Sequence, residues 1–149
     1  MSPGSGFVSG SDTITINAGG TSNIAGPDIA TTINGNSSGD VLSGGSENDV
    51  INGLNGDDTI DGGDGSDTLT GGVGSDVYLF NTNDVAAGEY ITENASEGTD
   101  VIVIVTSTDF ANMTVASFDE IEEIRFAGAN QTGTFTGAQL TGETLLLTE

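Results

Sequence analysis

Residues 35–79 form five consecutive units of nine residues: GNSSGDVLS, GGSENDVIN, GLNGDDTID, GGDGSDTLT and GGVGSDVYL. An aspartate stands at the sixth position of every unit, and an apolar residue follows it two positions later. The aspartates are Asp40, Asp49, Asp58, Asp67 and Asp76, and the apolar residues are Leu42, Ile51, Ile60, Leu69 and Tyr78. A period this regular predicts a repeat architecture in which every unit supplies the same structural element.

Each unit divides into a glycine-rich turn and a short strand. Glycine adopts positive φ angles at little cost, so such a turn can point its carbonyl groups inwards. In the strand, the middle side chain points to one face and its two neighbours point to the other. The apolar residues are therefore expected to stack into a narrow core, which predicts an all-β solenoid.

Carboxylates and turn carbonyls are hard oxygen ligands, and Ca²⁺ takes about six to eight of them. Mg²⁺ fits this pattern less well because it retains its waters and requires a strict octahedron. The candidate ligands are the five aspartates and the backbone carbonyls of the turns at Gly35, Gly44, Gly53, Gly56, Gly62, Gly65, Gly71 and Gly74. The alternative is a set of Gly/Asp β-turns that bind no metal.

The array resembles the RTX family of calcium-binding β-rolls, whose repeat is GGxGxDxUx. Its last unit, GGVGSDVYLF, is similar to the unit that usually closes such arrays. The resemblance implies a parallel β-roll in which two units make one turn, so that aspartates eighteen residues apart hold Ca²⁺ between them. It implies about three complete sites, at Asp40/Asp58, Asp58/Asp76 and Asp49/Asp67, and half sites could add to these at the two ends.

Some units depart from the repeat. Asn36 and Ser38 replace glycine in the first unit, Glu47 replaces it in the second, and Leu54 replaces it in the third. These departures affect the turns of the first sites. Four further acids near the turns are interpreted as solvated surface charge: Glu47, Asp57, Asp61 and Asp64.

The segments around the array differ in composition. Residues 1–12 are rich in glycine and serine, which predicts a flexible tail or one used in assembly. In residues 13–34 the nine-residue spacing of apolar residues continues towards the N-terminus, at Ile33 and Ile24. This predicts degenerate solenoid turns that form an N-terminal cap. An unrelated hairpin is the alternative. Residues 81–99 are expected to form a loop region with a short strand near Tyr90.

Residues 100–149 contain strand-like runs whose centres lie ten or eleven residues apart. The runs are Val101–Val105, Met113–Val115, Ile121–Phe126, Thr132–Thr136 and Thr144–Leu147. This spacing predicts solenoid rungs without metal-binding turns that extend and cap the array, and a small antiparallel sheet is the alternative. The last eight residues, GETLLLTE, are either a secretion signal or a final core strand.

The net charge of the chain is −22, and Arg125 is its only basic residue. This charge excludes a basic surface for nucleic acid, and no apolar run approaches the length needed for membrane insertion. Charge repulsion and the 24 glycines oppose compaction, so the metal-free chain is expected to be disordered. We therefore expect calcium binding and folding to be coupled.

Catalysis has few residues available in this chain. Cysteine and histidine are absent, which excludes disulfides, thiolate metal sites and the Ser-His-Asp and Cys-His triads, and disfavours zinc. A catalytic carboxylate pair is conceivable, but solvated charge is the interpretation for the remaining glutamates: Glu89, Glu93, Glu97, Glu120, Glu122 and Glu123. The sequence predicts a protein that is not an enzyme.

The RTX resemblance also implies export to the outside of the cell by type I secretion, and the absence of an N-terminal signal peptide suits this route. The first functional hypothesis is a secreted structural protein, at the cell surface or free of it. Its solenoid ends would join copies into a homo-oligomer such as a filament, surface layer or matrix. The alternative is a C-terminal secretion and folding module of a larger adhesin, toxin or secreted enzyme.

Overall fold

The computed structural model describes residues 12–15, 23–25, 29–93, 98–114, 118–140 and 146–148. One sheet contains, in order, β1 (Asp12–Thr15), β3 (Thr31–Asn34), β5 (Val50–Asn55), β7 (Thr68–Val73) and β9 (Tyr90–Thr92). The second contains β2 (Asn23–Ala25), β4 (Val41–Gly45), β6 (Thr59–Gly63), β8 (Val77–Phe80), β10 (Val101–Ile104), β12 (Glu123–Phe126) and β14 (Leu146–Thr148). A short pair joins β11 (Thr108–Asp109) to β13 (Gly133–Thr134).

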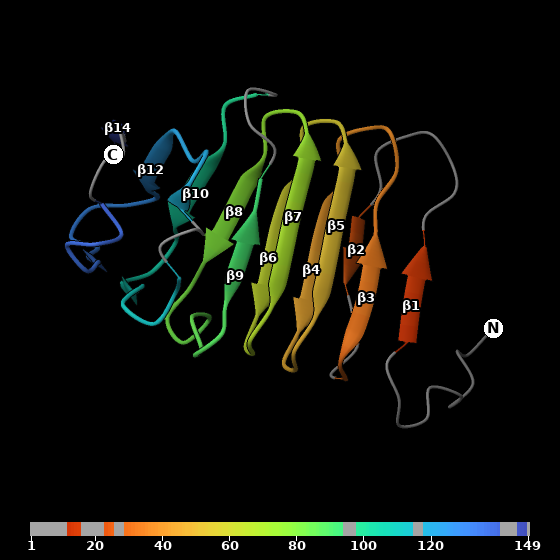
Figure 1. Ribbon diagram of the computed structural model, residues 1–149, viewed down its shortest axis with the longest axis horizontal. Coiled ribbons are helices and arrows are strands. Elements are labelled where there is room, and N and C mark those ends of the chain that lie inside the picture. The colour runs from red at the N-terminus through yellow and green to blue at the C-terminus, as the bar shows by residue number, and fades with distance from the viewer. Residues whose placement is uncertain are drawn as a thin grey trace.

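Successive strands of the array alternate between the two large sheets, so hydrogen-bonded neighbours lie two strands apart along the chain. Thr32 pairs with Val50 and Leu42 pairs with Ile60, which is a step of eighteen residues. Figure 1 shows the two sheets as facing layers, with the strands of one layer running against those of the other. The predicted all-β parallel solenoid, with rungs beyond the array, is confirmed.

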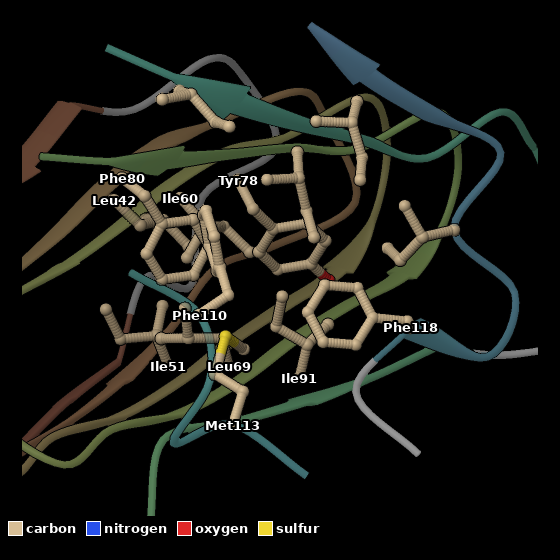
Figure 2. Packing of buried hydrophobic residues seen from close by; sticks show 14 of the residues in the cluster. Leu42, Ile51, Ile60, Leu69, Tyr78, Phe80, Ile91, Phe110, Met113 and Phe118 are labelled. Atoms are coloured by element: carbon tan, nitrogen blue, oxygen red, sulfur yellow. The ribbon is translucent and has the colours of Figure 1, made fainter. Parts of the chain in front are cut away.

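The two layers meet on a single stack of apolar side chains. The apolar residue of each unit is fully buried, from Leu42 to Tyr78. Figure 2 shows Leu42, Ile60 and Tyr78 of one sheet opposite Ile51, Leu69 and Ile91 of the other. Ile33, Ile91, Ile102 and Ile124 extend the stack beyond the array at both ends. In β4, β5, β6 and β7 the core is therefore one apolar residue wide per strand, and the nine-residue period sets it.

Beyond Phe80 the rungs become longer. Thr68 pairs with Tyr90 and Val77 pairs with Val101, so the steps grow to 22 and 24 residues. The extra length carries Phe110 and Phe118, whose rings pack edge to face with centroids 6.2 Å apart. Phe110 also packs against Phe80 at 5.2 Å. Aromatic packing thus takes over where the nine-residue period ends (Figure 2).

Several details of the C-terminal half differ from the sequence expectations. The antiparallel alternative is wrong, because β10, β12 and β14 pair in parallel. The run at Met113–Val115 was expected to be a strand, but Met113 is a buried residue outside any strand and β11 lies earlier. Met113 is apolar because it contacts the aromatic core, which a short apolar run cannot distinguish from a strand.

Four of the proposed segments lie partly outside the described residues. The tail at residues 1–12 is represented only by Asp12 in β1, and β1 and β2 pair in parallel with β3 and β4. In the region 81–99, β9 forms at the expected place and adds to the five-stranded sheet. Of the final GETLLLTE, Leu146–Thr148 form β14 at the end of the seven-stranded sheet.

Leu54 occupies a position that favours glycine. Its φ angle is 84°, and the equivalent residues Gly63 and Gly72 have φ angles of 89° and 107°. A side chain in this region of φ costs about 1–2 kcal/mol, and glycine avoids that cost. The side chain of Leu54 is exposed, so it recovers little by packing.

Replacing Leu54 with glycine should therefore stabilise the calcium-bound fold by about 1 kcal/mol, because it removes the strain and loses little burial. Urea unfolding at saturating Ca²⁺ measures the change. Leu54→Ala is the matched control, since it removes most of the side chain but keeps a Cβ at positive φ. Equal stability of the Gly and Ala variants would contradict the strain argument.

Candidate calcium sites

The five repeat aspartates are all buried, and each lies immediately before a strand. Their carboxylates bind backbone N–H groups one solenoid turn away. The N–H of Asp40 donates to Oδ1 of Asp58 at 2.7 Å, and the N–H of Asp58 donates to Oδ1 of Asp76 at 2.8 Å. On the other edge, the N–H of Asp49 donates to Oδ1 of Asp67 at 2.8 Å. The structure thus brings together the aspartates eighteen residues apart.

The second oxygen of these carboxylates is available for a cation. Oδ2 of Asp49, Asp58, Asp67 and Asp76 is buried and has no hydrogen-bond partner among the described residues. A buried, unpaired carboxylate oxygen is unfavourable, so a cation that binds there would stabilise the fold. This donor chemistry fits Ca²⁺, which prefers oxygen ligands and carries the charge that the site lacks.

The first glycine of each unit leaves room for this arrangement. A Cβ placed on Gly53 would come within 2.1 Å of Oδ2 of Asp58 and 2.6 Å of the carbonyl oxygen of Gly71. Carboxylate and carbonyl oxygens therefore converge over the glycine, as the sequence predicted for the turns. Asp58 with the Gly71 carbonyl, and the matching groups of the neighbouring units, are the residues that would hold calcium.

Asp40 differs from the other four aspartates. The side-chain amide of Asn36 donates to both of its carboxylate oxygens, at 3.0 and 2.9 Å, and the N–H of Asn36 donates to Oδ2 at 2.9 Å. Asn36 stands where the repeat has its second glycine. We infer that Asp40 is a weaker calcium ligand than Asp58, because a protein amide already binds its outer oxygen.

The series of carboxylates that each accept a backbone N–H one solenoid turn away is called here the carboxylate ladder. It continues beyond the repeat. The N–H of Asp67 donates to Glu89 at 2.9 Å, that of Asp76 donates to Asp100 at 2.9 Å, and that of Asp100 donates to Glu122 at 2.7 Å. Glu89 is fully buried, and its Oε1 has no partner among the described residues. These three acids were not predicted as site residues. A usable sequence signal exists, because each acid precedes a buried isoleucine by two positions, as the repeat aspartates precede theirs.

The interpretation of solvated charge is wrong for some acids and holds for others. Glu89 is buried, Glu93 is half-buried, and Oδ1 of Asp61 is buried without a partner among the described residues. Glu97 lies outside the described residues. The exposed acids are Glu47, Asp57, Asp64, Glu120 and Glu122, and the half-buried Glu123 forms an ion pair with Arg125 at 3.0 Å.

Burial dominates the electrostatics of the ladder. It raises the pKa of Asp58 to about 7 and that of Asp67 to about 6, with neighbouring carboxylates adding to the effect. Burial, and then the charges of Asp67 and Asp84, raises the pKa of Glu89 to about 8. At neutral pH the metal-free fold must therefore hold negative charge that it disfavours, and a divalent cation relieves this.

Asp58→Asn should raise the midpoint of calcium-induced folding roughly tenfold, because it removes a charge from two sites and keeps the Oδ1 acceptor. Asp40→Asn is the matched control and should shift the midpoint much less, since Asn36 already occupies that carboxylate. Calcium titrations followed by far-UV circular dichroism compare the two. Equal shifts would contradict the distinction between Asp40 and Asp58.

Acid should partly replace calcium. These carboxylates have a higher pKa in the fold than in the unfolded chain, so their contribution to metal-free stability is complete below about pH 4. That contribution is lost as the pH rises through the folded pKa values, about 6 to about 8. In EDTA, circular dichroism should show coil at about pH 8 and growing β structure as the pH falls to about 5. Coil throughout this range would contradict the prediction.

A family model of the RTX calcium-binding nonapeptide repeat, comprising four copies, matches residues 34–69 and again residues 43–78. The eighteen-residue strand register holds within the matched region, and also in the pairs that β2 and β3 form with β4 and β5. No curated protein and no solved structure matches the chain. RTX repeats form calcium-binding structural modules typical of secreted proteins. The nonapeptide array at residues 34–78 belongs to the RTX family of calcium-binding repeats.

Proposed function

We propose that the protein is a secreted, extracellular structural protein that folds when it binds Ca²⁺ and then assembles end to end with copies of itself. The observation that carries the calcium-dependent folding is the row of buried carboxylate oxygens without partners, from Asp49 to Asp76. The low calcium of a cell interior would leave such a chain unfolded, and external calcium at about 10⁻⁴–10⁻³ M would fold it.

The charge of the chain supports the same dependence. The net charge is −22, and Arg125–Glu123 is the ion pair that the described part of the chain contains. Carboxylate repulsion is therefore not relieved by basic side chains. Ions bound along both turn edges would neutralise it where it is greatest, at the buried aspartates.

The assembly proposal rests on the C-terminal end of the seven-stranded sheet. Leu147 pairs in register with Ile124, which is fully buried, yet Leu147 is 66% exposed and its neighbour Leu146 is 60% exposed. Among the described residues, β14 has a strand on one side alone. A strand edge with an uncovered apolar stack favours a further strand, and a head-to-tail contact of this type generates a filament.

The proposal includes no catalytic activity and no nucleic-acid partner. The RTX module is structural, and the buried carboxylates that the fold collects are used as backbone acceptors. Among the residues that the structure describes, no helix has the length and apolar character to cross a membrane. Calcium and further copies of the chain are therefore the proposed partners.

Light scattering after size exclusion, with electron microscopy, tests the assembly. With Ca²⁺ the protein should form fibres or sheets, and in EDTA it should be an expanded monomer. Leu147→Glu should abolish assembly without loss of calcium-induced β structure, because it places a charge on the exposed end of the core. Leu140→Glu, at an exposed leucine outside the sheets, is the matched control and should still assemble.

Monodisperse, folded particles of the unaltered protein in Ca²⁺ would contradict self-assembly. That result would instead support a folding and secretion module of a larger adhesin, toxin or secreted enzyme.

A further inference from the structure

Three carboxylates meet where the nonapeptide array ends. Asp76 is the last aspartate of the array, Glu93 follows β9, and Asp100 precedes β10. One oxygen from each of the three lies within 4.8 Å of the others. Two oxygens that each bind one Ca²⁺ at about 2.3–2.6 Å can be up to about 5 Å apart, so one ion can contact all three carboxylates.

Backbone contacts hold these carboxylates in position. Oδ1 of Asp100 accepts from the N–H of Asp76 at 2.9 Å. The two oxygens of Glu93 accept from the N–H groups of Gly71 and Gly72, at 3.2 and 3.4 Å. Each carboxylate is thus anchored through the backbone, and none of the three contacts neutralises its charge.

A buried oxygen without a partner points to a ligand at this place. Asp76 is completely buried, and its Oδ2 has no hydrogen-bond partner among the described residues. A Cβ placed on Gly71 would meet Oδ2 of Asp76 at 2.2 Å and Oε1 of Glu93 at 2.6 Å. The unpartnered oxygen and the glutamate therefore face the same space, which the absence of a side chain at Gly71 keeps open.

The cluster lacks a basic side chain. Arg125, the only basic residue of the chain, binds Glu123 through two hydrogen bonds of 3.0 Å. Three adjacent carboxylates with no cation from the protein would repel one another, so an added divalent cation is the fitting counterion.

We propose that Asp76, together with Glu93 and Asp100 from beyond the nonapeptide repeat, forms a Ca²⁺ site that binds more tightly than the sites between repeats. Glu93 and Asp100 lie beyond the matched residues 34–78. Three carboxylates carry more charge than the two aspartates of a repeat pair, and affinity for Ca²⁺ increases with ligand charge. Histidine and cysteine are absent from the chain, so softer metals are disfavoured.

This ion would link the array to the C-terminal rungs. Glu93 follows a strand of the five-stranded sheet, and Asp100 immediately precedes a strand of the seven-stranded sheet. A bound ion would therefore join a residue next to one sheet to a residue next to the other, at the point where the eighteen-residue register is lost. The proposal depends on calcium binding by the array, and it does not depend on self-assembly.

Glu93→Gln tests the site, with Glu120→Gln at an exposed glutamate as the matched control. Isothermal titration with Ca²⁺ should show that the unaltered protein and Glu120→Gln bind one ion at least tenfold more tightly than the rest. Glu93→Gln should lose that tight ion and keep the weaker ones. Tb³⁺ luminescence excited through tyrosine gives a second readout, since the Tyr78 hydroxyl lies 2.6 Å from the Gly71 nitrogen.

Asp100→Asn provides a second variant that keeps the acceptor for the Asp76 N–H. Far-UV circular dichroism at saturating Ca²⁺ checks that each variant folds, and the tight ion should be lost in Asp100→Asn as well. A tight ion that persists in a folded Glu93→Gln or Asp100→Asn protein overturns the site and leaves the repeat sites intact. Absence of calcium binding in the unaltered protein would overturn the calcium function of the whole array.

Discussion

The structure depends on a carboxylate placed two residues before each buried apolar side chain. One oxygen of that carboxylate accepts the backbone N–H of the preceding solenoid turn, as Asp76 does for Asp58. In Asp49, Asp58, Asp67 and Asp76 the other oxygen is buried and has no hydrogen-bond partner among the described residues. The hydrogen bond sets the spacing of the rungs, and the buried oxygen without a partner favours a bound cation. One side chain therefore links the register of the sheets to the proposed calcium ligands, which is the basis for the proposal that folding and calcium binding are coupled.

The apolar stack alone is too thin to compensate for this charge. Each strand of the array contributes a single fully buried residue, such as Ile60 or Leu69, to a core bounded by glycine-rich turns. Beyond Phe80 the balance changes, because the longer rungs add the rings of Phe110 and Phe118. Fewer carboxylates and more aromatic contacts mean that the C-terminal rungs depend less on ions. Along one continuous sheet, buried carboxylates that bind cations are thus replaced by aromatic packing as the main feature of each rung.

The resemblance to the RTX family implied the eighteen-residue pairing. The sequence itself predicted the repeat and the stacked core, because both follow from one exact period. It did not predict Glu89 or Asp100, because insertions after Phe80 break that period although the acid still precedes its isoleucine by two positions. Asn36 was visible as a departure, but its bonds to Asp40 depend on side-chain geometry that composition does not reveal. Met113 was mistaken for a strand residue because burial against aromatic rings and burial in a sheet give the same short apolar pattern.

The C-terminal end of the array and the C-terminal end of the seven-stranded sheet differ in the kind of surface that they leave uncompensated. At the junction with the longer rungs, the unpaired oxygen of Asp76 meets acids from Glu93 and Asp100, so the ladder ends in extra negative charge. At β14, the ladder has given way to exposed leucines, so the sheet ends in uncovered apolar surface. A cation can satisfy the first end and cannot satisfy the second, which only another apolar surface can cover. Calcium binding is therefore proposed to drive folding, and the edge of β14, which has a strand on one side alone among the described residues, is proposed to bind a neighbouring copy.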